Sequence, residues 1–187
     1  MAAILAKQPG AWDMLFDRYG TYVERLIVRV VGFDTEVPDL INEVFARALE
    51  GVDHLKDPSS LKAWLGSIAI FTSRVWIRNR GSRRRWMHLF SPHEMPDVPA
   101  AIAPPEVSQT LQRIYAVLQE LGTDERIAFT LRYIEGMELH EIAENTGVSL
   151  STVKRRLSRA DNIFLKRASR DSLLSERLAE SARWGSK

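Results

Sequence analysis

The chain has 187 residues, of which 45% are apolar, and this favours a packed core over general disorder. It has no cysteine, which excludes disulfides and thiolate metal sites and agrees with a reducing cytoplasm. The net charge of +2 does not by itself indicate a nucleic-acid partner. The apolar residues 2–6 are too few for a signal peptide, and the uncharged run 63–73 is too short to cross a bilayer. We therefore expect a cytoplasmic protein with no membrane insertion.

Two amphipathic helices are expected at the start of the chain. Residues 11–31 carry apolar side chains at spacings of three and four, and Gly32 is a suitable residue to end this helix. The second helix follows, with Thr35 as a candidate N-cap and Pro38 in its first turn. Its polar side is acidic, since residues 34–57 include seven carboxylates against two basic residues. Such a face is usually solvated, but it can equally meet a basic protein surface.

A third helix is expected over residues 61–80, after a loop at 52–60. Between Arg74 and Arg85 there are six arginines and no acid, with Trp76 among them. Arginines neutralise phosphates and aromatic rings stack on bases, so this helix end favours nucleic-acid contact over simple solvation. At ~100° per residue Trp76 lies nearly opposite Arg74, so a core role and a stacking role for this ring both stay open.

Five prolines and no apolar period mark residues 89–106 as a linker. The expected fold is therefore all-α, with two small helical domains joined by a Pro-rich flexible linker. We expect these domains at residues 1–88 and 107–170, followed by a tail at 171–187.

Residues 139–165 predict a helix-turn-helix in the second domain. Gly147 suits a turn that needs positive φ, and Ser149 suits the N-cap of the second helix. Val153 and Leu157 then recur at helical spacing and are expected to face inward. The opposite side carries donors for phosphates and base edges: Ser151, Thr152, Lys154, Arg155, Arg156 and Arg159. A hairpin with solvated arginines is the alternative, and the lack of any acid among these residues favours DNA contact.

The order of these elements resembles the small, extracytoplasmic-function group of bacterial RNA polymerase sigma factors. AWDMLFDRYGTYVERL and PDLINEVFARALEGVDHL resemble the start of the family's second conserved region. LKAWLGSIA and the arginine-rich helix end resemble its DNA-facing part. LQELGTDERIAFTLRYIEGMELHEIAENTGVSLSTVKRRLSRA is similar to the fourth region almost without a gap. One departure is that Ile70, Phe71 and Val75 stand where the family commonly has polar residues.

The resemblance implies two partners, core RNA polymerase and promoter DNA, with an anti-sigma factor as a further candidate. It implies that the second helix grips the clamp helices of the largest polymerase subunit through Asp39, Leu40, Asn42, Glu43 and Phe45. It also implies that the helix-turn-helix reads the minus-thirty-five element. The third helix and the loop before it would bind and open the minus-ten element, and the candidates there are His54, Lys56, Arg74, Arg78 and Arg80.

Two other classes of function fit the sequence less well. A sigma-like DNA-binding regulator that does not recruit polymerase would have no use for an acidic second helix. An enzyme is disfavoured because the four histidines are scattered and His140-Glu141 lacks the second histidine of a zinc helix. No phosphate-binding glycine loop or nucleophile motif occurs in the sequence. We therefore expect no cofactor, no metal site and no catalytic residue.

Overall fold

A computed structural model describes residues 10–55, 57–90 and 109–176 of the chain, with residues 81–90 described by their helical backbone alone. These residues form helices and contain no strand. The elements are α2 (Ala11–Val31), α3 (Val37–Gly51), η1 (Val52–His54), η2 (Pro58–Ser60), α4 (Leu61–Phe90), α5 (Gln109–Gln119), α6 (Thr123–Phe129), η3 (Thr130–Ile134), α7 (Leu139–Thr146) and α8 (Leu150–Ala168). The all-α fold expected from the sequence is confirmed.

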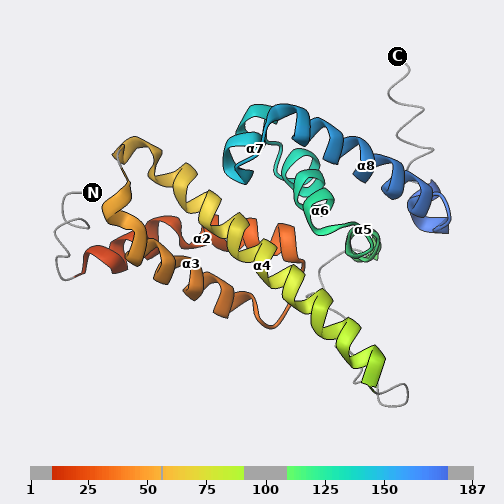
Figure 1. The fold of residues 1–187 in the computed structure, drawn as a ribbon, viewed down its shortest axis with the longest axis horizontal. Coiled ribbons are helices and arrows are strands. Elements are labelled where there is room, and N and C mark those ends of the chain that lie inside the picture. The colour runs from red at the N-terminus through yellow and green to blue at the C-terminus, as the bar shows by residue number, and fades with distance from the viewer. Residues whose placement is uncertain (1–9, 56, 91–108, 177–187) are drawn as a thin grey trace.

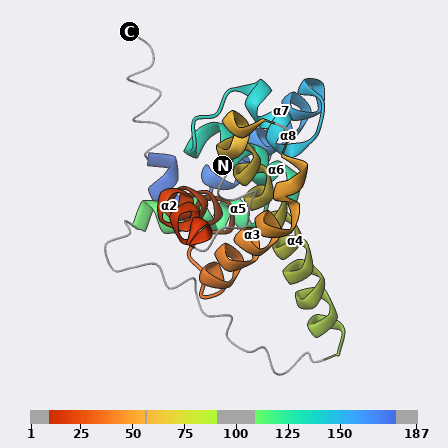
Figure 2. The same cartoon turned by 90° about the vertical axis from the view of Figure 1, so that its left-hand side faces the viewer.

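The long helix α4 lies between the two halves of the molecule (Figure 1). On one side it packs against α2 and α3, and on the other against α6 and α7. Leu65, Ala69 and Ile70 of α4 are buried in a core that includes Ile127 and Ile142 from the second half. The two halves therefore share one apolar core. The last turns of α4 extend beyond the other helices (Figures 1 and 2).

The turn between α2 and α3 differs in part from the sequence prediction. Gly32 ends α2 as expected, with φ +88° and its N–H donating to the Val28 carbonyl at 2.8 Å. The prediction that Thr35 caps α3 is wrong, since α3 begins at Val37 with Glu36 before it. Instead, an Asp34 carboxylate oxygen accepts a hydrogen bond from the Glu36 N–H at 2.9 Å. The Asp34 side chain thus bonds a backbone N–H two residues further on, as aspartate commonly does in turns.

The second half closes around two smaller apolar clusters. Tyr115 and Leu118 of α5 pack with Phe129 and Ala160. After α8, residues 172–176 form a helical turn whose Leu174 is buried against Val117 and Ala168. The first part of the expected tail is therefore part of the folded second half.

Helix α4 is longer than the sequence predicted. It continues through Gly81 to Phe90, ten residues beyond the expected end near Arg80. A single glycine in a helix interior costs about 1 kcal/mol, which is too little to end a helix that is otherwise favoured. Most of the expected linker and the tail beyond residue 176 lie outside the described residues.

The two glycines Gly20 and Gly147 make a matched test of this fold. At Gly147 φ is +67° and an added Cβ would meet no atom within 4 Å, so Gly147→Ala isolates the backbone strain. We expect it to lower the free energy of unfolding by about 1–2 kcal/mol. Gly20 lies inside α2, where a Cβ would make ordinary contact with Phe16 at 3.6 Å. Gly20→Ala should raise the free energy of unfolding by about 0.5–1 kcal/mol. Urea unfolding of both variants checks the pair, and equal shifts in one direction would contradict the assigned turn.

Candidate nucleic-acid and polymerase interfaces

Helices α7 and α8 form the predicted helix-turn-helix. Gly147 adopts the left-handed conformation at the end of α7, as expected. The Ser149 hydroxyl accepts a hydrogen bond from the Thr152 N–H at 3.3 Å and so caps α8. Glu138 and Glu141 form a capping box at the start of α7, a feature that was not predicted although the sequence has glutamates three residues apart there. Both helices are thus fixed at their N-termini.

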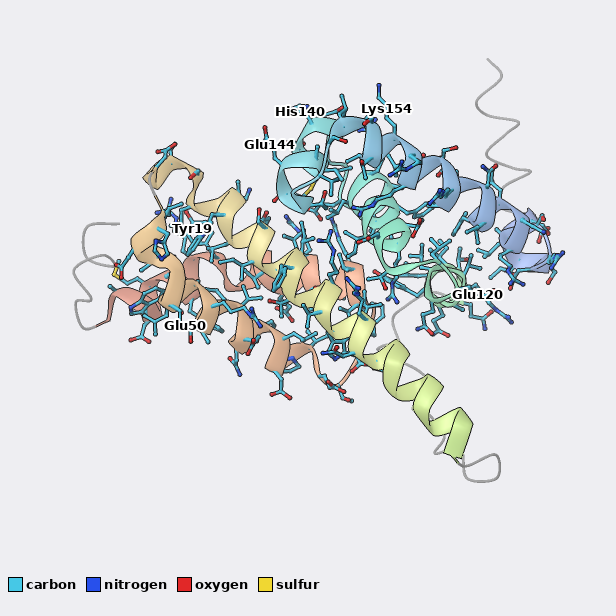
Figure 3. All side chains as sticks on the ribbon, viewed as in Figure 1. Tyr19, Glu50, Glu120, His140, Glu144 and Lys154 are labelled. Atoms are coloured by element: carbon cyan, nitrogen blue, oxygen red, sulfur yellow. The ribbon has the colours of Figure 1, made fainter. Side chains whose placement is uncertain are left out.

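Helix α8 is anchored by its apolar side. Val153, Leu157 and Ala160 are buried, and Phe164 is partly buried against Phe129 with ring centroids 4.7 Å apart. This leaves the other side of α8 accessible over its first two turns. In Figure 3, Lys154 lies with His140 on the side of the helix-turn-helix that faces away from α4.

The basic residues of α8 do not all lie in the same surroundings. Lys154 and Arg155 are exposed, and Arg159 is 65% exposed with its guanidinium 3.8 Å from Glu125. Arg156 is only 17% exposed and donates to the Asp124 carboxylate at 2.8 Å. The expectation that Arg155, Arg156 and Arg159 project together was therefore wrong for Arg156. Ser151 is exposed and Thr152 half-buried, and the hydroxyls of both lie 3.0 Å from that of Ser149.

The candidate minus-ten arginines on α4 are largely engaged within the protein. The Arg74 guanidinium lies 3.1 Å from Asp124 and Arg80 pairs with Asp34, whereas Arg78 is exposed. Trp76 donates its indole N–H to Glu36 at 2.7 Å, while the Arg80 guanidinium lies 4.8 Å from the Trp76 ring centroid. The ring is partly buried against the core as well. Trp76 is therefore held in place by Glu36, directly before α3, and is not a free stacking platform in this structure.

The loop before α4 is held by Asp57. Its carboxylate accepts hydrogen bonds from the Ser59 hydroxyl at 2.6 Å and the Ser59 N–H at 2.9 Å, and these lower the pKa of Asp57. His54 is exposed at the end of η1. Lys56 lies outside the described residues.

The polar side of α3 forms an exposed acidic face. Asp39, Asn42 and Glu43 are exposed, and Glu43 pairs with Arg47 at 2.7 Å. Leu40 is buried in the core, and Phe45 is half-buried with its ring centroid 4.9 Å from that of Phe16. Three large apolar side chains near this face are also exposed, which periodicity alone did not indicate: Phe16, Leu49 and Phe71. The Arg47 guanidinium lies 5.3 Å from the Phe71 ring centroid, which places α3 and α4 side chains on one surface.

The described residues contain no group of three histidine, aspartate or glutamate side chains that could hold a metal ion. Within the same residues, no helix combines the length and the apolar character needed to cross a membrane.

The described part of the chain has a helix-turn-helix with an exposed basic side, a long basic helix end and an acidic face. Together they define a helical DNA-binding protein with a separate surface suited to a basic protein partner.

The comparisons with known proteins assign the family. Residues 15–83 match the family Sigma-70 region 2, and residues 111–160 match the family Sigma-70, region 4. The ECF RNA polymerase sigma-E factor of Haemophilus influenzae is 29% identical over 158 residues, covering 80% of this chain and 83% of that protein. The ECF RNA polymerase sigma factor SigX of Bacillus subtilis is 27% identical, covering 83% of this chain and 82% of that protein.

Two solved structures share the fold. One is the sigma factor RpoE in complex with the anti-sigma factor NepR from Bartonella quintana, with a TM-score of 0.64, 24% identity, and coverage of 87% of this chain and 99% of that chain. The other is CnrH in complex with the cytosolic domain of CnrY, with a TM-score of 0.63, 25% identity, and coverage of 91% and 96%.

The chain belongs to the sigma-70 family, as an extracytoplasmic-function sigma factor. It binds core RNA polymerase and directs it to specific promoters, and its family is not one of enzymes. The family resemblance read from the sequence is confirmed.

The N-cap of the recognition helix α8 can be tested with two neighbouring serines. Ser149→Ala removes the acceptor for the Thr152 N–H and should lower the free energy of unfolding by about 1 kcal/mol. Ser151→Ala on the same exposed turn removes a hydroxyl that accepts no backbone donor, so its effect should stay within ~0.5 kcal/mol. Urea unfolding measures both. Equal losses from the two substitutions would mean that Ser149 does not cap α8.

Proposed function

We propose that the exposed side of α8 reads the minus-thirty-five element in the major groove. The observation that carries this proposal is that Lys154, Arg155 and Arg159 extend into solvent from a helix whose opposite side is anchored by Val153 and Leu157. Arginine forms bidentate hydrogen bonds with guanine, whereas a lysine ammonium suits a phosphate. Ser151, Thr152 and, after release from Asp124, Arg156 complete the proposed contact surface.

We also propose that the basic half of α4 and the loop before it bind the minus-ten element. Arg78 and His54 are exposed, and Arg74 and Arg80 would join them once their carboxylate partners are exchanged for phosphates. Lys56 belongs to the same loop in the sequence. On this assignment residues 1–88 act as one functional unit, residues 107–170 as the second, and residues 89–106 as the connection between them.

The polymerase grip is assigned to the exposed side of α3. Asp39, Asn42 and Glu43 supply its polar part, and Phe16 with Leu49 supplies exposed apolar area beside it. An interface with a few exposed aromatic anchors and a carboxylate rim suits a basic coiled coil. Because Leu40 is buried, it would contribute by holding α3 in the core and not by touching polymerase. Phe45 would contribute by packing against Phe16 and so fixing the position of that ring.

An anti-sigma factor is a further proposed partner. One of the solved structures similar to this chain contains a sigma factor bound to an anti-sigma factor. Because polymerase and promoter DNA are the working partners, we place the protein in the cytoplasm.

A pull-down with core polymerase, followed by transcription from promoters selected out of a random pool, distinguishes recruitment of polymerase from DNA binding alone.

Base readout by α8 predicts different effects for arginine and lysine substitutions. Arg155→Ala or Arg159→Ala should reduce discrimination at one base pair by about 1–3 kcal/mol. Lys154→Ala should weaken binding to all sequences alike, since a phosphate contact carries no base information. Competition binding of holoenzyme to matched and scrambled upstream elements measures both. Unchanged preference in the Arg155→Ala/Arg159→Ala double variant would overturn the assignment.

The polymerase assignment predicts that charge reversal on α3 weakens assembly. Asp39→Lys/Glu43→Lys should lower affinity for core polymerase about tenfold, and more at low salt, where screening is slight. The control Glu24→Lys/Glu144→Lys makes the same change in net charge at exposed positions on α2 and α7. Affinity is measured without DNA. If both double variants lose affinity equally, the effect is one of overall charge and not of this face.

A further inference from the structure

Phe71 is an exposed aromatic residue on the helix assigned to the minus-ten element. Its exposed fraction is 48%, whereas Trp64 and Trp76 of the same helix are partly buried against the core. Phe71 and its neighbour Ile70 are two of the positions where the family commonly has polar residues. Ile70 is buried in the core, so packing accounts for its apolar side chain. Packing in the core does not account for the ring at position 71.

A guanidinium lies beside the Phe71 ring. It belongs to Arg47 of α3 and is 5.3 Å from the ring centroid, within the ~6 Å range of a cation–π contact. Arg47 is 39% exposed, and its Nε donates to the Glu43 carboxylate at 2.7 Å, which fixes the guanidinium next to the ring. This bond uses Nε, so the two terminal nitrogens are not needed for it and can donate to a phosphate.

Helix α4 places further positive charge along the same face. Residues 61–90 contain no aspartate or glutamate. Arg78 is exposed and follows Phe71 by seven residues, which at ~100° per residue puts both on one face, about 10 Å apart along the helix axis. This distance is the length of about three stacked nucleotides. Arg74 lies one turn after Phe71 and pairs with Asp124. The face therefore combines an aromatic ring with cations at a spacing that suits a DNA strand.

We propose that Phe71 is a stacking platform for one unpaired base of the minus-ten element, with Arg47 holding the adjoining phosphate. The proposal deepens the assignment of α4 to that element and rests on it. A base that leaves the duplex loses its partner and its stacking. An aromatic ring replaces part of that stacking for any base, and a guanidinium neutralises the phosphate. Phe71 thus lowers the free-energy cost of opening without selecting the sequence that is opened.

Two other roles for the ring lead to different results. In one, Phe71 is an apolar anchor for polymerase, as proposed for Phe16. In the other, its contact with Arg47 only holds α3 against α4. The lack of carboxylates on α4 and the guanidinium beside the ring favour nucleic acid, whereas the carboxylates on the exposed side of α3 suit a basic protein. A polymerase contact would change the affinity for core enzyme, and a purely structural contact would change only the free energy of unfolding.

The first test combines one side-chain change with one DNA change. Holoenzyme binds a single-stranded oligonucleotide that carries the non-template minus-ten element of a promoter selected from a random pool. Each base in turn is replaced by an abasic nucleotide, which removes the base and keeps the phosphate. At one position this should weaken binding to wild type about five- to fiftyfold, but binding to Phe71→Leu by less than about twofold. Equal losses in wild type and Phe71→Leu at every position would overturn the proposal.

A larger ring and a distant ring provide the matched variants. Phe71→Trp should bind the intact oligonucleotide at least as tightly as wild type, because a larger aromatic surface stacks on the base. Tyr133→Leu makes the same change as Phe71→Leu at a ring that is 56% exposed in the second half and has no assigned contact with DNA or polymerase. It should leave binding within about twofold of wild type. An equal loss in Tyr133→Leu and Phe71→Leu would contradict the platform.

The cation beside the ring is tested by the salt dependence of binding. Arg47→Gln should weaken binding of the intact oligonucleotide and reduce the slope of log affinity against log salt by about 0.7, the value for one single-strand phosphate. Arg113→Gln removes the same charge from a side chain that is 63% exposed on α5, and it should leave the slope unchanged. The same slope in wild type and Arg47→Gln would remove Arg47 from the proposed site.

The outcomes separate the platform from the proposed function. If Arg78→Ala weakens binding of the oligonucleotide and Phe71→Leu does not, the platform is overturned while α4 keeps its assignment. If neither substitution weakens binding, the assignment of α4 to the minus-ten element fails as well. If Phe71→Leu lowers the affinity for core polymerase measured without DNA and the abasic losses are unchanged, the ring belongs to the polymerase interface. Should Phe71→Leu fail to fold, Phe71→Met takes its place.

Discussion

The packing of α4 between two groups of helices is the constraint on which the rest of the structure depends. The helix changes character along its length, from apolar at Leu61, Leu65 and Ala69, through polar at Thr72 and Ser73, to basic beyond these residues. Its apolar part buries side chains from both halves in one core, whereas its polar part meets α6 with donors left unpaired. Burial of apolar area holds the halves together. The free-energy cost of the unpaired polar atoms lowers the stability of this contact.

Carboxylates of the chain pair with some of its basic side chains and leave others exposed. Lys154, Arg155 and Arg78 are exposed, whereas Arg74, Arg156 and Arg80 are held by carboxylates of the protein itself. A net charge of only +2 is consistent with this arrangement, because many of the arginines have an acidic partner in the chain. Arginine pairs with phosphate as well as with carboxylate, so on the proposed assignment these pairs can be exchanged for DNA phosphates.

Local patterns predicted the elements well and their long-range partners poorly. Gly147, Ser149 and Val153 fix the helix-turn-helix through neighbours within a few residues, and all three were predicted correctly. The pairing of Arg156 with Asp124 spans 32 residues, and that of Arg29 with Glu135 spans 106. Helical periodicity gives the direction of a side chain from its own helix but not which distant carboxylate lies there. For the same reason the linker predicted two helical domains but not that described helices of both halves pack into one core.

Both halves of the free protein pack around α4, and one distance tests this packing directly. Ala63 on α4 and Glu144 on α7 are exposed, and spin labels can be placed there as the only two cysteines in the chain. Pulsed electron paramagnetic resonance should give one short, narrow distance for the free protein. A long distance, or a broad distribution of distances, would contradict the shared core.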